Sequence, residues 1–354
     1  MSSDTGGLED VKTSKSDAEQ ESLRLTSSKG LNFPTGFAEV FGRYWTIIAL
    51  VALIITFSAL DGSSFASTRN LLSILNEVSI LAVMASGLTV CLAMGLFDLS
   101  VGAAGTFGGF VVAKWAANGS NEHFILVLLM AVGVSVVIGL INGLVVGVLR
   151  VNAFIATLAT GSILTGLVLG YSQSQTIYLG LPSWFLDIGQ AKIGAIPMPV
   201  VIMVVVMVLL WIMLERTETG RHIYAVGGNA AASRLAGIRI LRYVLIAFVV
   251  AAATAVLAGT MANAIVGSAP PSDVGEVYLL NAYAAAFLGA ATIRRGKFHI
   301  VGTGVGVLLL GVISNGLSIA GAPSYWQDIL SGILVILAVF VSGLVSRVRG
   351  SAGF

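Results

Sequence analysis

The chain has 354 residues, of which 56% are hydrophobic and 10% are charged, and its mean hydropathy is +0.95. Because a soluble domain carries about 25% charged residues, this composition excludes a soluble globular protein and indicates a chain that is solvated by lipid. With a net charge of +2 and a single cysteine, the chain is expected to bind no nucleic acid and no metal, and to form no internal disulfide.

Residues 1–42 mix Lys, Glu, Asp and Ser with few apolar side chains. Such a segment buries too little apolar surface to fold alone, so we predict a disordered cytoplasmic tail. The tail is acidic as well as basic, and no short apolar stretch with a cleavage site follows it, so it is not predicted to be a signal peptide.

Ten apolar segments follow the tail. Most run for about 20 residues, which is the length of a transmembrane helix rather than of a barrel strand. The predicted segments are residues 44–60, 74–94, 99–117, 123–148, 153–171, 196–214, 243–266, 277–292, 299–318 and 326–345. The predicted fold class is therefore an all-α polytopic membrane protein with about ten transmembrane helices, in one transmembrane domain over residues 43–348.

The basic residues predict the orientation. With both termini in the cytoplasm, 16 of the 19 Lys and Arg residues fall on the cytoplasmic side, and Arg69, Lys114 and Lys192 are the exceptions. The positive-inside rule therefore favours an N-in and C-in topology. Ten helices divide into five plus five, and an odd number per half makes the halves enter the membrane from opposite faces, as in an inverted repeat.

The sequence GLFDLSVG at 95–102 places Asp98 and Ser100 between two apolar segments. A carboxylate at the centre of a spanning helix costs about 2.5–3.5 kcal/mol on insertion scales, so it is expected to have a structural or a transport role. Asp98 could cap a helix that begins at Leu99, contact the solute, or contribute to coupling, and the cap is the preferred interpretation.

Other polar or aromatic side chains inside apolar segments are candidate path residues. They are Phe107, Thr157, Thr160, Asn263, Asn281 and Asn315. Amides and hydroxyls suit a neutral polyol better than an ion relay, although a helical hydroxyl can instead bond to a carbonyl of its own helix. Gly139, Gly143 and Gly147 recur every four residues, which predicts close packing against a neighbouring helix.

No enzyme signature is present in the sequence. The nearest approach to a phosphate-binding loop ends in Gly296-Lys297, but it has Ala291 and Phe298 where a Walker loop needs Gly and Ser or Thr. We therefore predict no catalytic residue and no nucleotide hydrolysis by this chain. If ATP drives transport, another polypeptide hydrolyses it.

The longest internal hydrophilic loop covers residues 215–242. Asn229 is placed to cap a short helix over the alanine-rich run that follows, and glycines flank that run on both sides. Such a helix is either a docking element for a soluble partner or an amphipathic helix that rests on lipid headgroups. The pattern does not separate the two.

Four stretches together resemble the membrane permeases of bacterial ABC importers of the ribose, arabinose and simple-sugar type. They are GRHIYAVGGNAAASRLAGIRI at 220–240, LFDLSVG at 96–102, AFIATL at 153–158 and IVGTGVGVLLLGVISNGLSIAG at 300–321. The resemblance covers residues 60–345 with the stretches in the family's order. It implies a permease domain in the bacterial inner membrane.

The resemblance also implies that the loop at 215–242 is a cytoplasmic coupling loop. The coupling residues are then Gly220, Arg221, Gly227, Gly228, Asn229, Ala231, Arg234 and Gly237. The implied partners are an ATPase subunit or a tandem ATPase, a second copy of the permease or a homologue, and an extracytoplasmic sugar-binding protein. ATP and Mg²⁺ would bind to the ATPase, and this chain is expected to hold no cofactor.

The sequence thus predicts a permease subunit for a sugar or a related polyol. A permease for branched-chain amino acids or nucleosides is the alternative within this class. A stand-alone secondary transporter and a structural membrane scaffold are the alternatives from other classes.

Overall fold

The computed structural model describes residues 35–118, 124–272, 274–293 and 296–323, together with a few positions between 325 and 336. The chain divides into two units, Met1–Gly42 and Arg43–Phe354, and the second unit contains α3 and every helix that follows it. Most of the predicted tail lies outside the described residues. Helix α2 begins at Thr35, within the stretch that was predicted as tail.

The described elements are α-helices apart from one short antiparallel hairpin. They are α2 (Thr35–Phe65), α3 (Thr68–Ala93), α4 (Val101–Asn118), α5 (Phe124–Gly147), α6 (Ala153–Ser172), α7 (Ser183–Gln190), β1 (Lys192–Ile193), β2 (Ile196–Pro197), α8 (Met198–Arg216), α9 (Glu218–Gly228), α10 (Ala230–Leu235), α11 (Ile240–Val266), α12 (Glu276–Ala290) and α13 (Ile300–Ile319). In the hairpin, Lys192 pairs with Pro197 and Ile193 pairs with Ile196.

The predicted segments agree closely with the helices. Nine of the ten coincide with described helices, and the tenth, 326–345, lies mostly outside the described residues. Within the described part, six helices are long and apolar enough to cross a membrane, namely α3, α5, α6, α8, α11 and α13, and Tyr44–Leu60 is a shorter apolar helix. The chain is therefore an all-α polytopic membrane protein. The total of ten spans and the orientation stay predictions.

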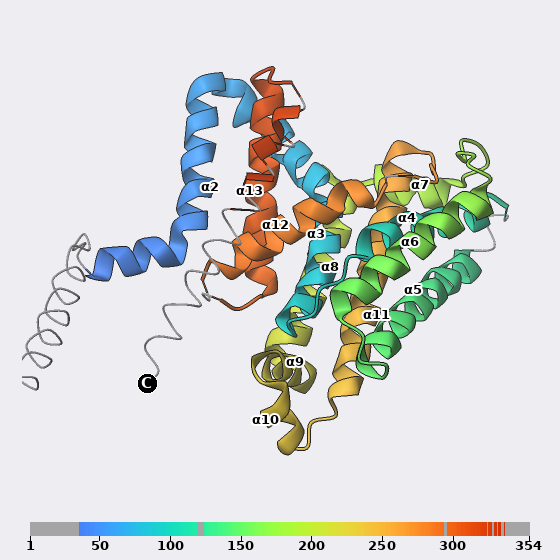
Figure 1. Ribbon diagram of the computed structural model, residues 1–354. Helices are drawn as coiled ribbons and strands as arrows, with labels where there is room; N and C mark the ends of the chain where they lie inside the picture. Colours follow the sequence, from blue (N-terminus) through green and yellow to red (C-terminus); the bar gives the residue numbers. More distant parts are fainter. Residues whose placement is uncertain are drawn as a thin grey trace, which may run out of the picture. The chain divides into compact units, whose positions relative to one another are not determined.

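The long helices α3 and α11 form the centre of this unit (Figure 1). In each of them 67% of the most apolar window is buried, compared with 28% or less in α5, α6 and α8. Helix α11 packs on α3, α4 and α5, whereas α3 packs on α11, α12, α13 and α8. Each central helix thus contacts a short helix and a long helix of the opposite predicted half. An inverted repeat would produce this exchange, and the repeat itself stays a prediction.

Helices α3 and α11 run in opposite directions. A Cβ added to Gly227 of α9 would lie 2.1 Å from the carbonyl oxygen of Ala93, the last residue of α3. The imidazole Nδ1 of His222, also in α9, lies 2.6 Å from the hydroxyl of Tyr243 in the first turns of α11. Since the 27 residues of α11 span about 40 Å, its C-terminal end lies far from α9. The chain therefore leaves the two central helices at opposite levels (Figure 1).

The short helix α4 follows the end of α3, and the short helix α12 follows the end of α11. The first turns of α4 and α12 meet. A Cβ on Gly275 would lie 2.0 Å from the carbonyl oxygen of Gly102, so backbone touches backbone at this point. The Gly275 N–H also donates to Thr106 Oγ1 at 2.8 Å. Helix α12 has 15 residues, which is too short to span a bilayer core of about 30 Å.

Glycine residues allow the closest helix crossings. A Cβ on Gly139 would lie 2.4 Å from Val249 Cα of α11, and the other two glycines of the stripe also face α11. The predicted packing role of this stripe is confirmed. At the crossing of α4 and α11, a Cβ on Gly259 would lie 1.9 Å from the carbonyl oxygen of Gly105. Small residues let backbones approach this closely in helices that pack in lipid.

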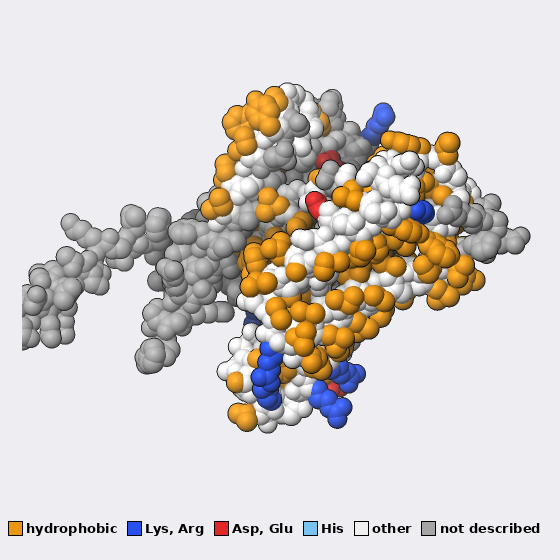
Figure 2. Space-filling model, turned by 45° about the vertical axis from the view of Figure 1, so that its right-hand side comes forward, with side chains coloured by type: hydrophobic (Ala, Val, Ile, Leu, Met, Phe, Trp, Pro, Cys, Tyr) orange, Lys and Arg blue, Asp and Glu red, His pale blue; other side chains and the backbone are white. Residues whose placement is uncertain are grey.

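The outer helices present apolar side chains to the surroundings. Leu129 of α5 and Ile163 of α6 are each more than half exposed, as are several other aliphatic residues on these helices. Figure 2 shows the apolar side chains over a broad area of one face. This apolar exterior is expected of a protein whose solvent is the bilayer core.

Candidate functional site

Most of the predicted site residues lie in three separate places rather than in one site. The break between α3 and α4 contains Asp98 and Ser100. A pocket where α11 joins α12 contains Asn263. The segment formed by α9 and α10, which we call the coupling segment (Glu218–Leu235), lies beside the first turns of α11.

The break begins where α3 ends at Ala93. Gly95 has a φ of +75° and no atom within 4 Å of an added Cβ, so the backbone conformation rather than packing favours glycine here. The N–H groups of Gly95 and Leu96 donate to the carbonyls of Leu92 and Cys91 at 2.9 and 3.0 Å. These bonds satisfy carbonyls that the end of α3 would otherwise leave without partners.

Asp98 is buried, with 1% of its surface exposed. Its Oδ1 accepts hydrogen bonds from the Ser100 backbone N–H at 2.9 Å and from Ser100 Oγ at 2.6 Å. The expected helix start at Leu99 is wrong by two residues, because Asp98 and Ser100 form a side-chain-bonded turn and α4 begins at Val101. The carboxylate nevertheless bonds to donors at the entrance of α4.

Three other helices hold the break. The Asp98 N–H donates to the hydroxyl of Tyr283 in α12 at 2.9 Å, and the next N–H along the chain donates to Thr157 Oγ1 in α6 at 3.0 Å. Asn142 of α5 donates from Nδ2 to Ser100 Oγ at 2.8 Å. The backbone N–H groups in the break have no helical carbonyl to bond to. Side chains of other helices accept their hydrogen bonds instead, because buried backbone groups need partners.

Sequence reasoning found Asp98, Ser100 and Thr157 but did not place Tyr283 and Asn142 with them. Tyr283 is 185 residues from Asp98, and Asn142 is 42 residues from Ser100. No local pattern links positions that far apart. Their polar groups inside apolar helices were the available signal, since such groups usually have partners when buried.

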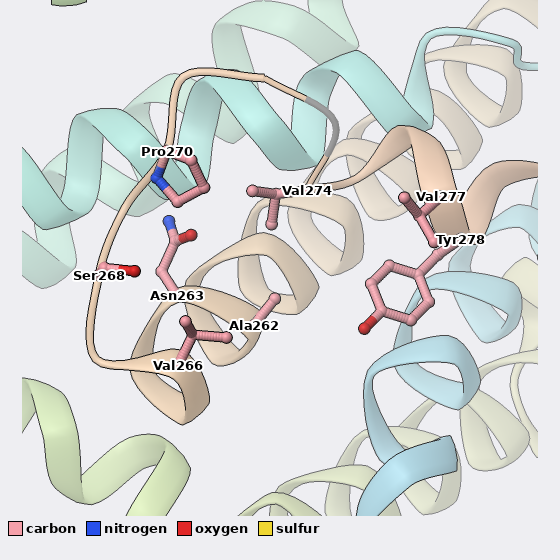
Figure 3. Close-up of a pocket in the computed structure, with 8 residues that line it drawn as sticks. All are labelled: Ala262, Asn263, Val266, Ser268, Pro270, Val274, Val277 and Tyr278. Carbon is pink, nitrogen blue, oxygen red and sulfur yellow. The ribbon is translucent and has the colours of Figure 1, made fainter. Parts of the chain in front are cut away.

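The pocket at the end of α11 measures about 200 Å³. It is lined by Ala262, Asn263, Val266, Ser268, Pro270, Val274, Val277 and Tyr278. Figure 3 shows the Asn263 amide turned toward Pro270 under the connecting loop, with the Tyr278 side chain approaching from α12. From Tyr243 to Asn263 the rise along α11 is about 30 Å, so the pocket lies far from the coupling segment.

The Asn263 side chain has no hydrogen-bond partner among the described residues. It is 2% exposed, and neither its amide nitrogen nor its amide oxygen has a partner among the described residues. An unsatisfied buried polar group costs about 1–3 kcal/mol. The amide offers both a donor and an acceptor, which is the combination that a hydroxyl group of a solute can satisfy.

Helix α12 connects the pocket with the break. Tyr278 lines the pocket, and Tyr283 bonds to the Asp98 N–H. Five residues of a helix rise about 7.5 Å, so a shift of α12 would move both tyrosines together. Phe97 in the break stacks on Tyr283 with a centroid separation of 6.1 Å.

The remaining candidates do not join either place. Thr160 Oγ1 donates to the Ala156 carbonyl of its own helix at 3.1 Å, and Phe107 packs among core residues of α4. Asn315 Oδ1 accepts from Asn70 Nδ2 at 2.9 Å. Asn281 has a buried Oδ1 without a partner in the described part of the chain. Within the described part of the chain, no group of three or more His, Cys, Asp or Glu is placed to hold a metal ion.

The coupling segment contains the helix that the sequence predicted. Asn229 Oδ1 accepts from the Ala232 N–H at 2.9 Å, which confirms the predicted cap. Gly237 follows α10 with a φ of +81°. Gly220 packs against α8, because an added Cβ would lie 2.0 Å from the Leu214 carbonyl oxygen.

One side of the coupling segment is not covered by the described residues. Ala231, Arg234 and Arg221 are exposed, and Leu235 is 91% exposed. Gly228 has no atom within 4 Å of an added Cβ, whereas its neighbour Gly227 packs on the end of α3. The segment is therefore anchored on the side of Gly227 and exposed, within the described part of the chain, on the side of Leu235.

The chain matches known proteins over most of its length. Residues 70–339 match the family described as branched-chain amino acid transport system / permease component. The ribose import permease protein RbsC of Escherichia coli strain K12 is 37% identical over 302 residues, which cover 84% of this chain and 92% of the relative.

Two further relatives have similar coverage. The ribose import permease protein RbsC of Bacillus subtilis strain 168 is 35% identical over 86% of this chain and 94% of the relative. The D-allose transport system permease protein AlsC of Escherichia coli strain K12 is 31% identical over 92% of this chain and 98% of the relative. No solved structure matches the chain.

Proposed function

The chain belongs to the family of branched-chain amino acid transport system permease components, and on that premise we propose that it is the membrane-spanning subunit of an ATP-driven importer for a sugar or a related polyol. It is a multi-pass protein of the bacterial inner membrane. Separate subunits hydrolyse ATP, and a binding protein delivers the solute from outside.

The solute class rests on the relatives and on the pocket. The relatives named above are permeases for ribose and allose, although the family description names branched-chain amino acids. The pocket is lined by Asn263, whose buried amide has no partner among the described residues, and by the hydroxyl-bearing Ser268 and Tyr278 among apolar side chains. These groups suit a neutral molecule with several hydroxyls. A free amino acid carries two charges, and the described lining contains no charged side chain to bind either of them.

The observation that carries the ATP-driven mechanism is the coupling segment. Helix α10 has six residues, which is too few for a helix to be stable by itself in water. It nevertheless exposes Leu235 almost completely, beside the exposed Arg234. An exposed aliphatic side chain at the end of a short helix fits a pocket with an apolar floor. We assign that pocket to the ATPase, which also binds ATP and Mg²⁺.

The proposed mechanism uses the opposite placement of the pocket and the coupling segment. Solute enters the pocket at the far end of α11, while the ATPase acts on α9 at the near end. Gly227 transmits movement of α9 to the end of α3, directly before the break that contains Asp98. Tyr283 joins this break to α12, and Tyr278 joins α12 to the pocket. A second permease copy or a homologue completes the path.

The experiment that tests this proposal is reconstituted uptake. The chain is purified with its ATPase and binding protein, placed in vesicles, and supplied with labelled pentoses, hexoses, polyols, leucine and a nucleoside. ATP-dependent uptake of a sugar or polyol is expected. Uptake of only leucine or only the nucleoside would refute the proposed sugar or polyol as the solute. Uptake by this chain without the ATPase, driven by a proton or sodium gradient, would refute the ATP-driven mechanism.

A variant separates docking from folding. Leu235→Asp places a charge on a side chain that touches almost nothing in this chain, so the fold should be unaffected. We expect the ATPase to be lost on purification. Leu179→Asp is the matched control, because Leu179 is also largely exposed but lies outside the coupling segment. Retention of the ATPase by the Leu235 variant would contradict the docking role.

A further inference from the structure

Four arginines surround a pair of adjoining hollows between α5, α10 and α11. Arg150, Arg234 and Arg239 line a pocket of about 310 Å³, whose apolar walls include Leu241. We call this pocket the arginine pocket. Its three arginines come from the loop after α5, the end of α10 and the start of α11. Arg239 and Leu241 also line a neighbouring groove along α11, which Arg242 borders.

The groove continues the arginine pocket with apolar surface. Beyond Arg239 and Arg242 it is lined by Leu241, Leu245 and Ile246. Leu149, next to Arg150, is 69% exposed, and Leu241 is 40% exposed. The two hollows together offer cations at one end and aliphatic side chains at the other, so they suit an amphipathic ligand.

The arginines are not neutralised within the chain. Among the described residues, the one contact of salt-bridge length joins His222 Nδ1 and Glu218 Oε1 at 3.7 Å, and none involves these four arginines. All four side chains are exposed. Figure 2 shows Lys and Arg side chains at the end where α9 and α10 lie in Figure 1. Three guanidinium groups around one pocket repel each other unless an anion lies between them.

We propose that the arginine pocket and its groove bind one anionic phospholipid, with the phosphate between Arg150, Arg234 and Arg239 and an acyl chain along α11. Guanidinium groups bind phosphate oxygens with two parallel hydrogen bonds, and their charge cannot be lost by deprotonation. The predicted orientation places this end at the cytoplasmic leaflet, where basic pockets between helices bind anionic headgroups.

The site also has a consequence for the coupling segment. Arg234 lies on α10, whereas Arg150 lies in the loop after α5 and Arg239 lies directly before α11. A phosphate that all three contact therefore ties α10 to α5 and α11. The lipid then holds the orientation of the coupling segment, and it leaves Leu235, which lines neither hollow, free for docking.

The test measures lipid retention by the purified full-length chain, without the ATPase. The chain is delipidated in detergent and titrated with phosphatidylglycerol or phosphatidylcholine, and bound lipid is counted by native mass spectrometry. We expect one phosphatidylglycerol to bind and phosphatidylcholine to bind at least tenfold more weakly. The double variant Arg150→Gln/Arg239→Gln should weaken phosphatidylglycerol binding about 30-fold. Two cations are removed, and each basic residue near an anionic lipid contributes a similar part of the binding free energy.

The control variant is Arg216→Gln. Arg216 is an exposed arginine at the end of α8 that lies over Trp211 and lines neither hollow. Its removal should leave lipid binding unchanged. Glycerol phosphate serves as a competitor without acyl chains, and it should not displace the lipid at millimolar concentration. Displacement would show a site for soluble phosphate, and equal binding of both lipids would overturn the proposal.

The two proposals fail independently. The variant Leu235→Asp should lose the ATPase and keep phosphatidylglycerol, whereas Arg150→Gln/Arg239→Gln should keep the ATPase and lose the lipid. If the double arginine variant loses the ATPase and keeps the lipid, the arginines bind acidic groups of the partner and the lipid site is refuted. If the double variant does not fold, the single variant Arg150→Gln in the exposed loop gives the same comparison with a smaller change.

Discussion

Asp98 offers the sharpest test of how the break between α3 and α4 is held. Its Oδ1 accepts two hydrogen bonds from Ser100, and its own surface is 1% exposed. In Asp98→Ala both bonds are lost. The Ser100 hydroxyl can rotate to another acceptor, but the buried Ser100 N–H cannot. One unsatisfied buried donor costs about 1–3 kcal/mol, and this is the expected loss of unfolding free energy.

In Asp98→Asn the side-chain oxygen remains and can accept both hydrogen bonds. Each bond becomes weaker when the acceptor loses its charge, by about 1 kcal/mol. The same change removes the desolvation penalty of a buried carboxylate, which acts in the opposite direction. The two effects oppose each other, so the asparagine variant should lie within about 1 kcal/mol of the parent. If Asp98 acts only as an acceptor, uptake should also be nearly normal.

The assays are thermal unfolding in detergent and ATP-dependent uptake in reconstituted vesicles. Asp187→Asn in α7 is the control, because Asp187 is an exposed carboxylate far from the break in sequence. An Asp98→Asn protein that folds with parental stability but does not transport would show that the charge itself is required. An Asp98→Ala protein as stable as the parent would show that the hydrogen bonds to Ser100 do not contribute to the stability of the fold.

Three further predictions follow from the packing. Gly139→Leu should destabilise the fold by several kcal/mol because its Cβ would meet the backbone of α11, whereas Gly133→Leu, which has open space, should not; thermal unfolding compares them. Gly227→Ala should reduce uptake because it pushes α9 away from α3, while Gly228→Ala should leave the melting temperature unchanged, because its Cβ meets no described atom within 4 Å. Asn263→Leu should raise the solute concentration for half-maximal uptake at least tenfold without lowering the melting temperature, since the amide has no partner to lose; an unchanged value would exclude Asn263 from the path.

The sequence alone determined the helices and their chemical character. Residence in lipid requires about 20 apolar residues per crossing, and that requirement is visible in one dimension. The cap at Asn229 and the packing role of Gly139 were predicted for the same reason, because each depends on spacing within one helix or on its own neighbours. The family was also recognisable, since its motifs are contiguous.

Only the tertiary structure decided which polar groups meet. Thr157 and Thr160 looked equivalent in the sequence, yet Thr157 bonds to the backbone of the break and Thr160 bonds to its own helix. Asn263 and Asn315 were equal candidates, but Asn263 is unpartnered in a pocket and Asn315 is paired with Asn70. These outcomes depend on which helices cross and at what level, and a hydrogen bond between distant residues leaves no local pattern in one sequence.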